Sequence, residues 1–145
     1  TDGIEIKDRL RLLFHSMSLP GATLVWHCPY IVLFCSGDGK VYGKDYREYG
    51  LIKLYGENEV DTDFANNSIM MKKTDKFPGW DAWKKINKDG MEYEVELKRR
   101  GNRIVLKTTI LGIEIENITT VNDDTDKVYA ALTGDQVAIT DIRIK

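Results

Sequence analysis

Apolar and polar residues alternate strictly over residues 91–98, where Met, Tyr, Val and Leu are separated by glutamates. A period of two is typical of a strand with one buried and one solvated face. The turn at 100–102 predicts a hairpin whose returning strand covers residues 103–110. We expect Arg103 and Lys107 of this second strand to lie near the glutamates across the ladder.

Short strand-like segments separated by Gly, Asp and Asn also fill most of the remaining chain. Strands are predicted over 22–26, 30–35, 40–42, 47–55, 68–73, 113–118, 128–132 and 137–144. A change of parity between Ile139 and Ile142 predicts a β-bulge near Thr140 and Asp141. Many short strands without strand–helix alternation indicate an all-β protein, either an antiparallel two-sheet β-sandwich or a barrel.

Two segments are compatible with a helix. From Asp8 to Met17, apolar residues recur at three- and four-residue spacing, which predicts a short N-terminal helix. Leu10, Leu12 and Phe14 equally fit a strand, so both alternatives stay open. A second short helix is predicted near residues 79–87, where an amphipathic stretch follows Pro-Gly.

Chain length and net charge limit the classes of protein to which this sequence can belong. The 145 residues fit one domain, 1–145, and the net charge of −2 gives no electrostatic footprint for nucleic acid or an anionic membrane. No stretch approaches the ~20 apolar residues of a membrane span. Because the sequence begins at Thr1 without Met, we expect a piece of a larger multidomain protein with covalently linked neighbouring domains. Cys28 and Cys35 are expected to be reduced.

The sequence contains few residues in patterns that are typical of a catalytic site. Neither His15 nor His27 stands at a metal-ligand spacing, and no nucleophile, phosphate-loop or dinucleotide motif occurs. Glu92, Glu94 and Glu96 lie on one regular outward face, which is typical of a solvated ladder rather than of a glycosidase pair. The sequence therefore favours a protein that is not an enzyme, with a small glycan hydrolase as a lesser alternative.

Aromatic residues are the strongest candidates for ligand contact. Trp80 and Trp83 are three residues apart and share one face if their segment is helical. Tyr46 and Tyr49 are spaced in the same way. Each pair either packs into the core or forms an aromatic platform on which sugar rings stack.

Polar loop residues could complete such a platform. Asn66, Asn67 and Gln136 are candidates to bind sugar hydroxyls. The chain has no EF-hand spacing, but its acidic loops could hold a structural calcium ion. The carboxylates considered are Asp38, Asp61, Asp63, Asp123, Asp124 and Asp126.

The last sixty residues or so resemble concanavalin-like jelly rolls. The similarity is carried by Asp89-Gly90, Tyr93-Glu94-Val95, Arg100-Gly101-Asn102-Arg103-Ile104, Val128-Tyr129, Leu132-Thr133-Gly134 and Ala138-Ile139-Thr140-Asp141-Ile142-Arg143-Ile144. Domains of this kind occur as carbohydrate-binding modules and lectin-like accessory domains. The resemblance implies a two-sheet sandwich, often with one concave face, that binds its ligand on that face or on loops at an edge.

The leading hypothesis is a non-catalytic, polysaccharide-binding module of a bacterial protein. Its site would combine the four aromatic residues above with Asn66, Asn67 and Gln136. The alternative is a sensory or protein-interaction domain of an intracellular bacterial signalling protein. The compartment follows the function: extracellular for the first hypothesis, cytoplasmic for the second.

Overall fold

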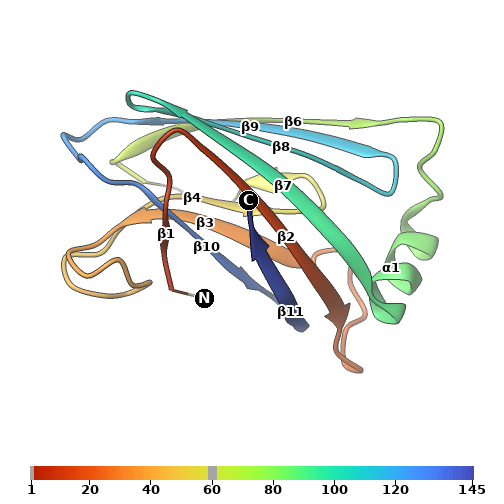
Figure 1. Cartoon of the computed structure of the whole chain (residues 1–145). Helices are drawn as coiled ribbons and strands as arrows, with labels where there is room; N and C mark the ends of the chain where they lie inside the picture. The colour runs from red at the N-terminus through yellow and green to blue at the C-terminus, as the bar shows by residue number, and fades with distance from the viewer. Residues whose placement is uncertain (1, 59–61) are drawn as a thin grey trace.

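The computed structural model describes residues 2–58 and 62–145, and this part of the chain forms two antiparallel sheets packed face to face (Figure 1). The five-stranded sheet has the order β1 (Ile4–Glu5), β10 (Tyr129–Gly134), β3 (Pro29–Cys35), β4 (Arg47–Lys53) and β5 (Glu57–Asn58). The six-stranded sheet has the order β11 (Val137–Ile144), β2 (Arg9–Ser18), β7 (Met91–Arg100), β8 (Arg103–Ile110), β9 (Ile113–Val121) and β6 (Ala65–Lys73). The predicted all-β sandwich is confirmed.

The core lies between the two sheets. Alternate residues of β2, β7 and β8 point inward and meet buried residues of β3 and β4. Phe14 of β2 and Tyr93 of β7 stack with ring centroids 5.3 Å apart. The bulge predicted in the last strand is confirmed, because the register of β11 against β2 shifts between Thr140 and Arg143.

Of the two alternatives left open for the N-terminal segment, the strand is confirmed and the helix was wrong. The segment is strand β2, in which Leu12 pairs with Val95 and Phe14 with Tyr93 of β7. Leu10, Leu12 and Phe14 are buried on one face, whereas Leu13 and Met17 point outward. Pairing with both β7 and β11 satisfies the backbone of this segment on both sides, and this outweighs its helical spacing.

Two predicted strands are loops. Within 22–26, the backbone N–H groups of Thr23 and Leu24 both donate to Nδ1 of His27, which holds a turn in place of a ladder. Within 40–42, the N–H of Lys40 donates to the carboxylate of Asp38. In both loops a side chain supplies the hydrogen bonds that a partner strand would otherwise make.

The predicted second helix is confirmed as α1 (Trp80–Asp89), which packs at one end of the sandwich, just before β7 (Figure 1). Its buried face carries Trp83 and Asn87. The hydroxyl of Tyr93 donates to Oδ1 of Asn87, and this bond ties the helix to the sheet. No helix in the described residues is both long and apolar enough to cross a membrane.

The β8–β9 hairpin depends on Gly112. Leu111 and Gly112 have φ values of 49° and 80°, as the central residues of a tight two-residue turn require. A Cβ on Gly112 would lie 2.4 Å from the backbone nitrogen of Phe77, which cannot move freely. Gly101 also has a positive φ of 59°, but a Cβ there would meet nothing within 4 Å.

Gly112→Ala is therefore expected to destabilise the fold more than Gly101→Ala. Both substitutions place alanine in the left-handed region at a cost of about 1–2 kcal/mol. Only Gly112→Ala also forces two backbone segments apart. Urea unfolding of the two variants measures the difference, and equal losses would contradict this account of the turn.

Candidate functional site

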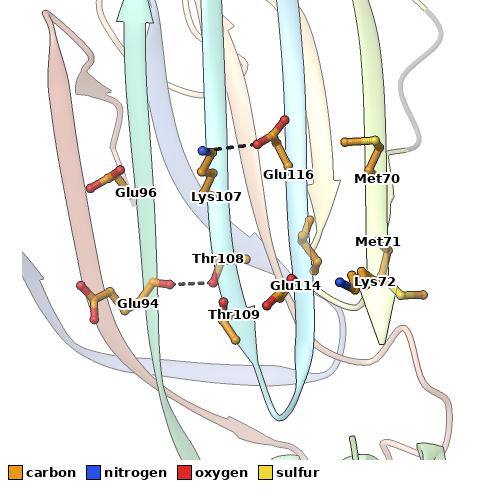
Figure 2. Close-up of a pocket in the computed structure, with 11 residues that line it drawn as sticks. Met70, Met71, Lys72, Glu94, Glu96, Lys107, Thr108, Thr109, Glu114 and Glu116 are labelled. Atoms are coloured by element: carbon orange, nitrogen blue, oxygen red, sulfur yellow. Dashed lines mark hydrogen bonds and ion pairs between the residues drawn. The ribbon is translucent and has the colours of Figure 1, made fainter. Parts of the chain in front are cut away.

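A groove runs across the outer face of the six-stranded sheet, over β7, β8, β9 and β6 (Figure 2). Its volume of about 940 Å³ lies within the usual range of ligand sites. Most of the lining side chains come from alternate strand positions, which point to one face of the sheet. The lining residues are Met70, Met71, Lys72, Glu94, Glu96, Lys107, Thr108, Thr109, Glu114, Ile115 and Glu116.

Strand register places opposite charges in one row across this groove. Glu96 of β7 lies opposite Lys107 of β8, which lies opposite Glu116 of β9. Nζ of Lys107 is 3.4 Å from a carboxylate oxygen of Glu116. Met70 of β6 completes the row. A ligand lying along this row would meet an acceptor, a donor, a second acceptor and an apolar side chain in turn.

Arginines of β2 hold the carboxylates of β7. Nη2 of Arg9 donates to Oε2 of Glu96 at 2.5 Å, and Arg11 donates to Glu94. The hydrogen bond from Arg9 is the main cause that lowers the pKa of Glu96. Glu96 therefore remains an anionic acceptor down to lower pH than a free carboxyl would.

Three groove side chains keep their hydrogen-bonding capacity unused. Glu114 of β9 lies opposite Lys72 of β6, and Thr109 of β8 lies opposite Glu114. The described residues supply no hydrogen bond or ion pair to these three side chains. They are the groups in the groove that are most available to a ligand.

Two of the predicted stacking residues lie in the core and do not form a platform. Trp83 of α1 and Tyr49 of β4 are both 0% exposed. The Tyr49 hydroxyl donates to Asp123 at 2.8 Å. Neither ring can present a face to a sugar, so the prediction that they stack on ligand was wrong. Helical spacing aligns Trp80 with Trp83, but the face they share packs against the core of the sandwich.

The other two predicted aromatics are half-buried and lie apart. Trp80 packs edge-on against Phe77 and Trp83, and Nζ of Lys73 lies 5.1 Å from its ring centroid. Tyr46, in the loop between β3 and β4, donates its hydroxyl to Glu48. Their rings contact different neighbours, so the structure does not assemble Trp80 and Tyr46 into one surface.

The three predicted polar residues do not lie together in one site either. Asn67 is used internally, because its Nδ2 donates to the backbone oxygen of Tyr49 at 2.7 Å. Gln136 is exposed in the turn between β10 and β11, and it does not line the groove. Asn66 is exposed on β6, on the same face as Met70 and Lys72, and it alone of the three shares the face of the groove.

A buried polar network joins β9 to the opposite sheet. Asn117 and Thr119 are fully buried, and Nδ2 of Asn117 donates to Oγ1 of Thr119 at 3.0 Å. Nδ2 of Asn58 donates to Oδ1 of Asn117 at 2.9 Å, and Thr119 donates to Asn67 at 2.5 Å. Asn67 is thus a structural residue and not a ligand contact.

Asn117→Ala is expected to lower the free energy of unfolding by about 1–3 kcal/mol, because it leaves buried polar groups without partners. Glu114→Ala, on the exposed face of the same strand, should change stability by less than about 0.5 kcal/mol. Urea denaturation measures both. A tolerated Asn117→Ala would mean that the network does not hold β9 to the other sheet.

No group of three or more His, Cys, Asp or Glu in residues 2–58 and 62–145 is placed to hold a metal ion. The Asp38 carboxylate accepts from Ser36 and Lys40, and Asp123 forms an ion pair with Arg47 at 2.9 Å. The calcium candidate Asp61 lies outside the described residues. Both cysteines are free, as predicted.

The predicted placement of Arg103 and Lys107 near the glutamates of β7 is confirmed only in part. Lys107 does lie opposite Glu96, but its ion pair is with Glu116 of β9. Arg103 lies opposite Arg100. Strict alternation identified the solvated face, but it carries no information on which strands flank the hairpin, so the groove itself was missed.

Comparisons of the chain with protein-family models, curated proteins and solved structures find no match.

Proposed function

We propose that this domain is a non-catalytic glycan-binding module whose binding surface is the groove on the outer face of the six-stranded sheet. The observation that carries the proposal is the open groove of about 940 Å³, lined by charged and polar side chains. A β-sandwich with a hollowed sheet face suits an extended polymer, because the chain of the ligand can run across the strands.

The lining residues match the chemistry of a sugar. Every sugar hydroxyl is both a donor and an acceptor, so it can bond to a carboxylate such as Glu114 and to an ammonium group such as Lys107 or Lys72. The exposed Met70 side chain offers apolar contact to the C–H faces of the ring. None of the described residues that line the groove is aromatic, so hydrogen bonding rather than stacking would set the affinity.

Affinity electrophoresis through gels that contain soluble polysaccharides tests this proposal. The natural chain should be retarded by at least one glycan, and the double variant Thr109→Ala/Glu114→Ala should lose most of that retardation. Asp81→Asn on α1, a fully exposed acid outside the groove, is the matched control. Trp80→Ala should also migrate like the natural chain. Unretarded migration in every gel would overturn the proposal, and so would equal retardation of the groove variant.

The same gels address the hydrolase alternative. Reducing-sugar release from each polysaccharide is expected to stay at the blank value with the natural chain. Release that disappears in Glu114→Gln would identify a glycan hydrolase in place of a binding module.

A protein-interaction role is favoured by one other surface. Met17, Leu19, Leu24 and Trp26 are all exposed near the connection from β2 to β3. Clustered exposed apolar side chains are typical of contact surfaces. Neighbouring cyclase or kinase domains in the full-length gene, together with a negative glycan panel, would favour a sensory domain in the cytoplasm. A neighbouring glycosidase or dockerin would favour the extracellular glycan-binding module.

A further inference from the structure

A second hollow of about 280 Å³ continues the groove over the β7–β8 hairpin. It shares Glu96 and Lys107 with the groove, so the two form one continuous surface. Its other lining residues are Lys98, Arg100, Arg103 and Val105. This end of the face is therefore strongly basic, whereas the groove itself carries four glutamates.

Two arginines in this hollow face each other without an acidic partner. Arg100 of β7 lies directly opposite Arg103 of β8. Like charges at opposed positions of a ladder repel each other. The described residues supply no ion pair to either guanidinium, and Arg103 lies opposite the neutral Thr120 on its other side.

Most other cations on the same face have an acidic partner among the described residues, Lys72 at the far side of the groove excepted. Arg9 and Arg11 pair with glutamates of β7, and Lys107 pairs with Glu116. The pair formed by Arg100 and Arg103 thus retains its full charge next to a ligand groove. Two planar guanidinium groups offer the fork of donors that binds carboxylate and sulfate with two parallel hydrogen bonds.

We propose that the ligand is an anionic glycan whose carboxylate or sulfate group binds between Arg100 and Arg103 while the rest of the chain follows the groove. This inference rests on the proposed glycan-binding function. Hydroxyl groups on each sugar would donate hydrogen bonds to Glu94 and Glu114. The carboxylate side chains of an acidic peptide are acceptors only and could not make these bonds. Val105 supplies an apolar floor between the two regions.

The test compares pairs of polysaccharides that share a sugar backbone and differ in charge. Polygalacturonate is matched with its methyl ester, and dextran sulfate with dextran, in affinity electrophoresis at low salt and at 0.5 M salt. We expect the charged member of at least one pair to bind at least tenfold more tightly at low salt, and the preference to fall as salt rises. Arg100→Gln/Arg103→Gln should remove the preference without unfolding the domain.

Lys85→Gln/Lys88→Gln is the matched control, because it removes the same charge from exposed positions of α1, at the other end of β7. An equal loss in this control would show a general effect of net charge and would overturn the inference. Equal binding of both members of each pair would overturn it while leaving the glycan-binding function intact. Binding of no polysaccharide would overturn both, and binding of polyglutamate alone would identify an acidic peptide as the partner.

Discussion

Trp83→Ala is expected to lower the free energy of unfolding by about 3–5 kcal/mol, the largest stability loss of any single substitution considered for this domain. The Trp83 side chain is fully buried where α1 closes one end of the sandwich. Its removal would leave a large cavity that the two sheets cannot collapse to fill.

Urea denaturation measures this loss, and Trp83→Phe keeps the experiment informative if the alanine variant does not fold. Trp80→Ala is the comparison, since the Trp80 ring is half-buried and should cost clearly less. Glycan retardation per folded molecule should be unchanged in Trp83→Phe. A variant that unfolds normally but no longer binds would restore the view of Trp83 as a ligand contact.

Lys107→Met is expected to weaken glycan binding about tenfold to a hundredfold, because hydrogen bonds to charged groups contribute about 1.5–3 kcal/mol. Lys107 lines both the groove and the adjoining basic hollow, and it lies between Glu96 and Glu116 in the central row. Loss of its charge removes a donor and leaves these two carboxylates to repel any acidic substituent on the ligand.

Isothermal titration with the polysaccharide that the electrophoresis identifies measures the change. Methionine keeps an unbranched side chain of similar length, and a substitution at this exposed strand position should alter stability by less than about 0.5 kcal/mol. Lys85→Met on α1 serves as the control. Unchanged affinity in Lys107→Met would show that the ligand does not cross the centre of the groove.

The hairpin of β7 and β8 could be predicted closely because its alternation is strict and its turn contains Gly101. The segment that forms β2 could not, because its apolar residues satisfy both helical and strand spacing, and only pairing with β7 and β11 decides between them. Burial of Trp83 was equally undetermined, since spacing shows which residues share a face but not what covers that face.

The groove could not be predicted from the sequence for a related reason. Its walls come from β6 and β7, which lie at opposite sides of a four-strand segment in the order β7-β8-β9-β6. The alternation of β7 and β9 shows that their glutamates face outward, but not that both sets face one ligand-sized hollow. Exposed charges that look like ordinary solvated surface in the sequence acquire a candidate role only when the strand order is known.

Amide chemical-shift changes in the ¹⁵N-labelled domain, titrated with a short oligosaccharide of the bound glycan, test the location of the binding surface most directly. We expect the largest changes at outward-facing positions of β7, β8 and β9, centred on Lys107, Thr109 and Glu114. Changes confined to Trp80, or to the exposed loop that contains Leu24 and Trp26, would contradict the assignment of the groove as the binding surface.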